Sequence, residues 1–390
     1  MILYWLSIIA GTLAAVGCVY LVVAVWFAAR FPRRPVPAAP AVMPDVTILK
    51  PLHGSEPRLL ENLASFCTQK YSGAVQIVFG VQDPDDGAIA TVRQLQAKFP
   101  DRRLDLVVDT TMHGLNRKVS NLINMWRHAE HDVVVVADSD MRADRLYLAR
   151  VVTALQGDGV GAVTCLYHGL PGAGFWAGLC ALGINAHFLP DVVMGLGLNL
   201  AQPCFGSTIA LTRKTLTEIG GFDEVADCLA DDYAIGAALR ARGYEIAVSP
   251  VSIGHACADM SALELWQHEL RWARTIRSLD PLGYAGSMIT HPFALALIAA
   301  VAGGVTGAIG PVVSAGLAAV ALGCRFALLR QVERSFKLVR HPLWVVPARD
   351  ILSFAVFVLS FFGQSARWRG RRYRFIARGT LVPVGSSPRT

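Results

Sequence analysis

The sequence predicts an α/β doubly wound domain that is attached to a membrane by apolar segments near both ends of the chain. Hydrophobic residues make up 53% of the 390 residues and charged residues only 17%, against roughly 25% in typical soluble domains. The apolar residues collect in an N-terminal segment and in a C-terminal region. Between these regions, short apolar runs alternate with helical stretches, a pattern typical of a parallel sheet covered by helices on both faces.

The basic residues lie beside the apolar segments. The formal net charge is +7, and the arginines and lysines gather at 30–34, 325–340 and 367–378. This placement fits anionic lipid headgroups better than a nucleic-acid groove. We therefore expect a lipid bilayer and no nucleic acid among the partners.

Residues 1–30 predict a transmembrane anchor. The stretch is almost uncharged and ends in arginines, whereas a signal peptide would begin with basic residues and have a shorter apolar core. The arginines at its end place the following domain in the cytoplasm. A Pro/Ala-rich linker follows at 31–45.

The catalytic domain is expected at 46–260, with its ligands at the carboxyl ends of the strands. Helices are expected at Pro57–Gln69, Ala88–Phe99 and Val119–Ala129. Strands are expected at Val46–Lys50, Val75–Gln82, Leu104–Asp109, Val133–Asp138, Gly161–Tyr167, Ser207–Thr212 and Glu245–Ser249.

Further membrane helices are expected at 291–363. Pro292–Leu329 is long enough for two spans that turn near Gly310-Pro311. The apolar stretch at 343–363 is interrupted by Arg349-Asp350, which fits either a full span or a re-entrant or interfacial helix. The basic tail at 364–390 is expected in the cytoplasm.

An apolar strand that ends in two acids, Asp138-Ser139-Asp140, predicts a metal site. Carboxylates at i and i+2 point to the same side of a strand. Mg²⁺ commonly combines one or two carboxylates with substrate phosphates. The pair is also compatible with an acidic turn that caps the next helix.

Acids follow two other elements. The strand at 75–82 runs into Asp83, Asp85 and Asp86, which either bind a nucleotide or form a Pro-Asp turn. Asp231 and Asp232 open a helical stretch, where the helix N-terminus favours an ionised carboxylate that can act as a base. A simple N-cap is the alternative.

The fourth element is an amphipathic interfacial helix at 261–280. His268, Arg271 and Trp272 fall on one face of it. Arginine offers permanently charged planar donors to phosphate, and Trp a rigid stacking surface. A basic membrane-surface helix is the alternative, and both roles can hold together.

This order of motifs resembles family-2-like glycosyltransferases of the GT-A fold, whose pattern is D, D(x)D, (E/D)D, then (Q/R)xxRW. It is more similar to the ceramide glucosyltransferase family, family 21, and within it to the bacterial hopanoid-biosynthesis branch. The motifs that carry the resemblance are Leu49-Lys50-Pro51-Leu52, Glu56-Pro57, Val81–Asp86, Asn116–Leu122, Asp138-Ser139-Asp140, Cys204-Phe205-Gly206, Gly220-Gly221-Phe222, Ala230–Tyr233 and Arg271-Trp272.

The resemblance implies an inverting, metal-dependent hexosyltransferase that uses a UDP-sugar donor, a membrane lipid acceptor and Mg²⁺ or Mn²⁺. The hopanoid branch implies transfer of N-acetylglucosamine from UDP-N-acetylglucosamine to bacteriohopanetetrol at the bacterial inner membrane. Ceramide with UDP-glucose is the alternative pair of substrates. One departure is His268 at the first position of (Q/R)xxRW, where the charge of histidine depends on pH.

The resemblance also implies residue roles. Asp232 is the base, Asp231 orients the donor sugar, and Asp138 and Asp140 hold the metal. His268, Arg271 and Trp272 grip the diphosphate. The residues expected to line the rest of the donor pocket are Asp83 and Asp86, at the uridine, and Lys50, Glu56, Asn116 and Lys118. Lys50 and Lys118 are also compatible with solvated surface positions.

Two other classes of protein are less consistent with the sequence. A processive polysaccharide synthase would need more membrane spans to enclose a polymer channel. A non-catalytic scaffold would not need acids in every motif. No motif identifies the acceptor lipid.

Overall fold

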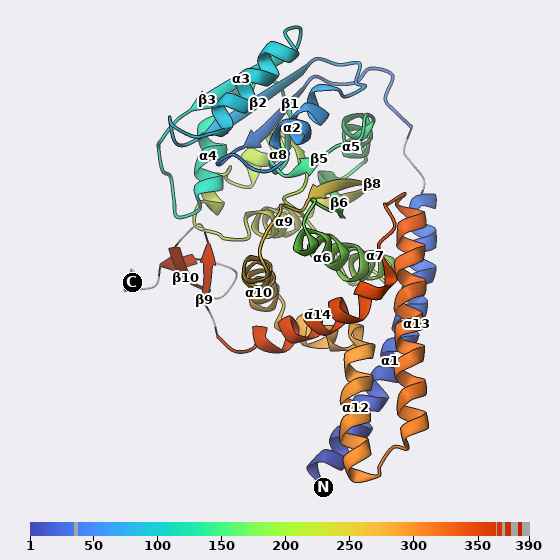
Figure 1. Ribbon diagram of the computed structural model, residues 1–390. Helices are drawn as coiled ribbons and strands as arrows, with labels where there is room; N and C mark the ends of the chain where they lie inside the picture. Colours follow the sequence, from blue (N-terminus) through green and yellow to red (C-terminus); the bar gives the residue numbers. More distant parts are fainter. Residues whose placement is uncertain (35–37, 364, 369–370, 376–380, 384–390) are drawn as a thin grey trace.

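The architecture is an α/β domain standing on a group of long helices. A computed structural model describes residues 1–34, 38–363, 365–368, 371–375 and 381–383. The domain occupies the upper part of Figure 1, and a group of long helices extends below it with the N-terminus at the far end. This arrangement confirms the predicted fold class, an α/β domain with apolar helices from both ends of the chain.

The domain is built on a mixed sheet, in which the described strands follow the order β3-β2-β1-β4-β7-β6-β8-β5. The strands are β1 (Val46–Pro51), β2 (Val75–Val81), β3 (Arg103–Val108), β4 (Val133–Val136), β5 (Met141–Arg142), β6 (Val160–Leu170), β7 (Ile209–Thr212) and β8 (Glu245–Ala256).

The first half of the sheet is parallel, as predicted. Val46 of β1 is in register with Val75 of β2 on one side and with Val133 of β4 on the other. Beyond β4 the sheet is mixed, because β7 runs antiparallel to both β4 and β6, so the parallel arrangement that the continuous apolar strands indicated does not extend through the whole sheet.

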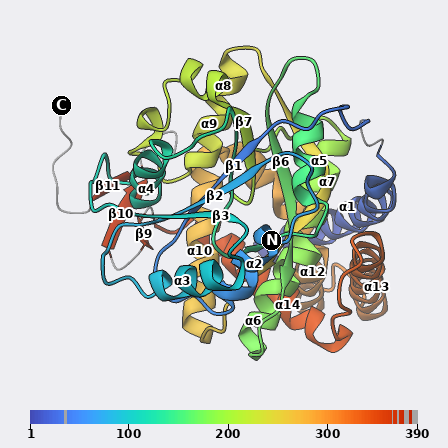
Figure 2. The same cartoon turned by 90° about the horizontal axis from the view of Figure 1, so that it is seen from above.

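Helices cover both faces of the sheet, as Figure 2 shows from above. Successive strand residues point to opposite faces, so Ile48 and Val135 belong to one core while Leu49 and Val134 belong to the other. The first core is closed by α2 (Leu59–Cys67), α3 (Ala88–Lys98) and α5 (Tyr147–Leu155), and the second by α4 (Arg117–Trp126), α8 (Arg213–Glu218) and α9 (Asp231–Ala241). Continuous apolar strands are buried here because both faces are covered.

The strand predicted at Val133–Asp138 is shorter than expected. β4 ends at Val136, and Asp138-Ser139-Asp140 lies in a turn in which Met141 N donates to the carbonyl of Asp138 at 3.3 Å. Strand geometry therefore does not persist through the two carboxylates. The expectation that they share one side for that reason is wrong.

An apolar segment after β6 is helical, which the sequence reading missed. It comprises α6 (Phe175–Gly183), a π-helix at Ile184–Phe188 and α7 (Leu189–Gly197). The segment is long and apolar enough to cross a membrane, but it is mostly buried against the rest of the protein. Its apolar composition reflects contact with protein on several sides.

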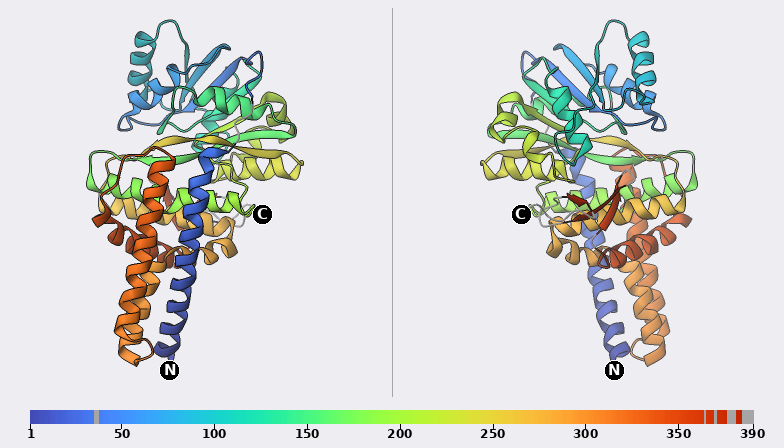
Figure 3. Two further views of the ribbon diagram at one scale, coloured as in Figure 1. Left: turned by 90° about the vertical axis from the view of Figure 1, so that its right-hand side faces the viewer. Right: turned by 90° about the vertical axis from the view of Figure 1, so that its left-hand side faces the viewer.

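The long helices are α1 (Ile2–Arg30), α12 (Pro292–Thr306) and α13 (Pro311–Ser335), and they lie side by side in Figures 1 and 3. α13 begins at the turn predicted at Gly310-Pro311. Gly17 permits the close approach of α1, because a Cβ there would lie 2.4 Å from the carbonyl oxygen of Ile289. Among the described residues, four helical segments are long and apolar enough to cross a membrane, or five when the bent pair 281–290 and 292–306 is taken as one span.

The remaining elements lie at the junction of the domain and the long helices. α14 (Val346–Ser360) crosses the direction of α1, α12 and α13 at a steep angle in Figure 1 and runs beside α10 (Ala262–Leu279). This orientation favours the interfacial alternative over a full span. The other elements are α11 (Pro281–Gly286), the short helices at Phe31–Arg33, Asp223–Val225, Ser287–Thr290 and Leu343–Val345, and an antiparallel sheet of β9 (Ser365–Trp368), β10 (Arg371–Phe375) and β11 (Leu381–Pro383).

Candidate active site

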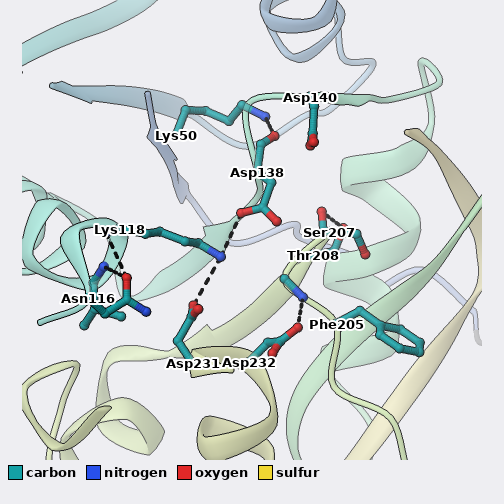
Figure 4. Close-up of polar contacts among 12 residues, drawn as sticks. Lys50, Asn116, Lys118, Asp138, Asp140, Phe205, Ser207, Thr208, Asp231 and Asp232 are labelled. Carbon is teal, nitrogen blue, oxygen red and sulfur yellow. Dashed lines mark hydrogen bonds and ion pairs between the residues drawn. The ribbon is translucent and has the colours of Figure 1, made fainter. Parts of the chain in front are cut away.

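Two acidic motifs that are far apart in the sequence meet on one lysine. Nζ of Lys118 lies 2.8 Å from Oδ1 of Asp138 and 3.1 Å from Oδ2 of Asp231 (Figure 4). Burial alone would lower the pKa of Lys118, but the charges of Asp138, Asp231 and Asp232 outweigh it and raise this pKa above its ordinary value. Lys118 is therefore a charged ammonium that joins the Asp138-Ser139-Asp140 motif to the Asp231-Asp232 motif, not a solvated surface residue.

Asn116 fixes the position of Lys118 by starting α4. Its Oδ1 accepts from the backbone N–H groups of Lys118 at 2.9 Å and Val119 at 3.3 Å. Its Nδ2 donates to the carbonyl of Cys228 at 2.7 Å, which ties α4 to the segment before α9. These bonds give Asn116 a structural role, and a contact to the donor stays a prediction.

Lys50 is also buried, at the end of β1. Its ammonium donates to the backbone carbonyl of Asp138 and lies 3.8 Å from the ring centroid of Phe66. Burial lowers its pKa to about 7, although Asp138, Asp140 and Glu56 oppose that shift. The surface alternative is therefore wrong for Lys50 as well.

Unneutralised negative charge collects around Asp140. Its Oδ2 lies 3.5 Å from Nδ1 of His255, whereas its Oδ1 is buried without a hydrogen-bond partner, as is Oε2 of Glu56. Burial, followed by the charge of Asp140, raises the pKa of Glu56 to about 7. Burial also raises the pKa of Asp140; His255 opposes this shift and Asp138 adds to it.

This charge imbalance fits a divalent cation bound by oxygen atoms. In the described parts of the chain, no group of three or more His, Cys, Asp or Glu side chains is arranged to hold a metal by itself. Asp138 is directed toward Lys118, and Asp140 is set apart from it in Figure 4. The two carboxylates would supply part of a ligand set, which suits a cation that takes its other ligands from phosphate and water.

Asp232 is held at the first turn of α9. Its Oδ2 accepts from the N–H of Gly206 at 2.9 Å and its Oδ1 from the N–H of Tyr233 at 2.8 Å. Burial and then Asp231 raise its pKa to about 6, against the effects of Lys118 and the two N–H groups. A Cβ at Gly206 would lie 3.0 Å from Oδ2 of Asp138 and 3.1 Å from Nζ of Lys118, so a larger residue here would require these two side chains to shift.

α10 places Trp272 and His268 next to aromatic side chains of β6 and β8. The ring of Trp272 lies 4.9 Å from that of His268, 6.2 Å from Tyr167 and 6.3 Å from His255, measured between centroids. Since His255 pairs with Asp140, these contacts connect Trp272 to the Asp138-Ser139-Asp140 turn through His255.

Arg271 is largely buried, and no described residue forms an ion pair with its guanidinium; burial lowers its pKa to about 10. A desolvated arginine without an acid fits an anionic ligand. Burial and the nearby Arg271 lower the pKa of His268 to about 3, so its ring is neutral at physiological pH. His268 therefore does not replace the charge of an arginine at this position of the motif.

The two acids expected at the uridine differ in exposure. Both oxygens of Asp86 accept from the N–H of Gly54 at 2.9 Å, and its Oδ1 accepts from the N–H of Ala88 at 2.8 Å. Asp86 thus ties the loop after β1 to the start of α3, which is the turn role named as the alternative. Asp83 is exposed, and the one hydrogen bond that its carboxylate accepts from the described residues comes from the N–H of Asp85, at 3.0 Å. Contact of either residue with uridine stays a prediction.

Three site residues were missed by the sequence reading. His255 and Tyr167 lie in buried stretches of β8 and β6 to which the sequence reading assigned no site residue, and Phe205 precedes Gly206, whose N–H donates to Asp232. Only Phe205 had a usable signal, since it lies within the Cys204-Phe205-Gly206 motif.

Comparison with known proteins identifies the family. Residues 9–381 match glycosyl transferase family 21. The chain belongs to this family. Ceramide glucosyltransferase 1 of Caenorhabditis elegans is 26% identical over 241 residues, which are 61% of this chain and 51% of that protein. A ceramide glucosyltransferase of Gibberella zeae is 31% identical over 187 residues, 43% of this chain and 35% of that protein.

The chain spans about half the length of the curated relatives it matches first. Among solved structures, the mannosyltransferase PcManGT from Pyrobaculum calidifontis, in complex with GDP-Man and Mn²⁺, is 23% identical with a TM-score of 0.58. The match covers 92% of this chain and 99% of that one. At this identity the likeness concerns the fold, and it confirms the GT-A architecture.

Proposed function

We propose that this member of family 21 is an inverting hexosyltransferase that moves a sugar from a UDP-sugar to the hydroxyl of a membrane lipid. The observation that carries the proposal is that Lys118 pairs with both acidic motifs. Its Nζ lies 2.8 Å from Asp138, of the proposed metal-binding motif Asp138-Ser139-Asp140, and 3.1 Å from Asp231, of the proposed base motif Asp231-Asp232. A group that leaves as a diphosphate and a hydroxyl that loses a proton would then react within one site.

Asp232 is the proposed general base. Its carboxylate is oriented by the N–H groups of Gly206 and Tyr233, and its pKa of about 6 leaves it ionised at neutral pH while keeping it basic enough to take a proton. Asp231 neutralises part of Lys118 and positions the donor sugar.

The diphosphate is proposed to lie between the acidic turn and α10. A bound Mg²⁺ or Mn²⁺, held by Asp138 and Asp140, would neutralise charge on the leaving UDP. Arg271 would bind phosphate oxygens from the other side, with neutral His268 as a hydrogen-bond donor and Trp272 as a stacking surface. The mannosyltransferase with GDP-Man and Mn²⁺ has the same fold, which supports a metal–nucleotide-sugar site here.

The apolar helices support a lipid acceptor. Each CH₂ group in the bilayer contributes about 0.8 kcal/mol, so a lipid leaves the membrane at a high cost. A site that lies at the membrane surface needs only the polar headgroup to emerge. The arginines at the domain end of α1, Arg30, Arg33 and Arg34, support a cytoplasmic domain. The proposal of a bacterial inner membrane rests on the resemblance to the hopanoid branch.

For the substrates, we propose UDP-N-acetylglucosamine and bacteriohopanetetrol, in keeping with the resemblance to the hopanoid branch. A second candidate is UDP-glucose with ceramide, which the names of the ceramide glucosyltransferase relatives favour. Membranes incubated with each labelled donor and each lipid distinguish them. Glucose transfer to ceramide alone would exclude the hopanoid assignment.

Asp232→Asn tests the base. We expect at least a 100-fold loss of transfer, because an amide cannot accept the proton, while UDP-sugar binding stays close to that of the wild type. Asp158→Asn, which changes an exposed aspartate far from the motifs, is the matched control. Transfer at the wild-type rate by Asp232→Asn would exclude the assigned base.

A further inference from the structure

A buried ion pair joins α10 to α14 outside the proposed site. Nη2 of Arg349 donates to Oε2 of Glu269 at 2.7 Å, and Nη1 of Arg349 donates to the other oxygen of the same carboxylate. Nη1 also donates to the carbonyl of Leu179 on α6 at 3.3 Å. Both side chains are largely buried, with 6% of Arg349 and 14% of Glu269 exposed. A bidentate pair of this kind fixes geometry as well as charge.

Glu269 lies within the stretch of α10 that carries His268, Arg271 and Trp272. It follows His268 directly and precedes Trp272 by three residues, so Glu269 and Trp272 are neighbours on the helix surface. Among the residues of α10, only Leu265 and Ala273 are buried. Apolar packing alone therefore constrains the rotation of this helix weakly, and the ion pair supplies the missing constraint.

α14 is itself fixed to the membrane helices. Asp350, next to Arg349, lies 3.2 Å from Nε of Arg325 on α13 and 2.9 Å from Nε2 of His187 on the π-helix. Arg325 is fully buried and also donates to the carbonyl of Ala186 at 2.7 Å. Polar contacts thus connect α13 to α14 and α14 to α10.

The two helices are joined a second time at their far ends. Nη2 of Arg274 donates to the carbonyl of Phe362 and Nη2 of Arg277 to that of Gly363, both at 2.9 Å. α14 and the residues that follow it therefore contact α10 at Glu269 in its middle and near its C-terminal end, and Arg271 lies between these two contacts.

We infer that Arg349 is a positioning residue for the donor site, because its ion pair with Glu269 sets the rotation and height of α10 and so directs Arg271 and Trp272 toward the diphosphate. This inference rests on the proposed function. Arg349 contacts no reacting atom. Its effect passes through α10, and a displacement of about 1 Å at a reacting centre costs roughly 100-fold in rate.

Gly183 on α6 offers a test that removes no polar group. A Cβ there would lie 2.5 Å from Cζ of Arg349, so Gly183→Ala pushes the guanidinium away from its place. Gly178→Ala is the matched control, because the same substitution on the same helix meets nothing within 4 Å. Glu269→Gln, which keeps the size of the side chain and removes its charge, is a second and independent variant.

The full-length protein in detergent is titrated with UDP and Mn²⁺, and transfer to lipid and the thermal midpoint are measured for each variant. We expect Gly183→Ala and Glu269→Gln to weaken UDP binding and lower kcat by about 10-fold to 100-fold, with the KM for lipid unchanged. Gly178→Ala should match the wild type. In the double variant the losses should not add, since both substitutions act on one contact.

The outcomes separate the two claims. Folded Gly183→Ala and Glu269→Gln proteins with wild-type UDP affinity and turnover would overturn the positioning role, as would a lower thermal midpoint without any change in UDP affinity. A wild-type protein that binds no UDP and transfers no sugar would instead refute the proposed function, on which the inference depends.

Discussion

At the scale of single residues, the site has more buried negative charge than positive charge. Lys118 forms ion pairs with the carboxylates of Asp138 and Asp231, and Lys50 donates a hydrogen bond to a backbone carbonyl and not to a carboxylate. Glu56 and Asp140 consequently keep buried oxygens without partners, and their pKa values rise. Groups held in this condition are typical of sites that receive a cation with their substrate.

The pH dependence of transfer should follow Asp232. Its folded-state pKa is raised to about 6, so the carboxylate is ionised above that pH and protonated below it. Because a base has to be deprotonated, we expect kcat at saturating donor and lipid to fall about tenfold per pH unit as the pH decreases below 6.

Asp231→Asn provides the control for this pH profile. Asp231 is the second cause of the raised pKa after burial, and removing its charge should move the acid limb of the profile to lower pH. A wild-type acid limb near pH 4, or a limb that Asp231→Asn leaves in place, would argue against Asp232 as the titrating base.

At the scale of elements, the N-cap of α4 holds a site residue, Lys118, in place. Asn116 accepts hydrogen bonds from two N–H groups at the start of α4 and donates one to the carbonyl of Cys228. We expect Asn116→Ala to lower the free energy of unfolding by roughly 2 kcal/mol, from the lost cap and the unpaired carbonyl together.

Asn116→Asp separates these two contributions. The aspartate keeps the acceptor for the N–H groups and loses the donor to Cys228, so its thermal midpoint in detergent should lie between those of Asn116→Ala and the wild type. If Asn116→Ala unfolds at the wild-type midpoint, the cap contributes little to stability.

The elements also show what the sequence could predict. Buried strands such as Val133–Val136 were found because parallel strands covered on both faces are continuous apolar runs. The antiparallel direction of β7 was not predicted. The direction of a strand depends on the path of the chain between it and the preceding strand, and strand composition does not reveal that path. The segment 175–197 was missed because apolar composition alone does not distinguish a buried helix pair from loop-connected strands.

The site residues that could be predicted are those that lie within recognisable sequence motifs. Asp138, Asp231 and Lys118 meet as expected of one pocket, although each was identified from a different stretch of sequence. His255 and Glu269 could not be assigned from sequence, because their importance depends on partners from distant elements, Asp140 and Arg349.

At the scale of the whole molecule, apolar helices have two different orientations. α1, α12 and α13 extend away from the domain together, whereas α14 runs beside α10 and is bonded to it near both ends. We propose that α1, α12 and α13 cross the bilayer and that α14 lies at the membrane surface, because α14 is held against α10 and crosses the direction of the other three helices.

This orientation predicts which residues can be labelled from outside the cell. We expect the α12–α13 turn on one side of the membrane, and the domain and both ends of α14 on the other. Single cysteines are introduced at the exposed positions Val312, Val339 and Phe362. An impermeant maleimide should label Val312→Cys on intact cells, and Val339→Cys and Phe362→Cys only after permeabilisation.

The unmodified chain, whose cysteines are buried or half-buried, gives the background. Labelling of Phe362→Cys together with Val312→Cys on intact cells would mean that α14 crosses the bilayer, which would separate the end of α14 from Arg274 and Arg277.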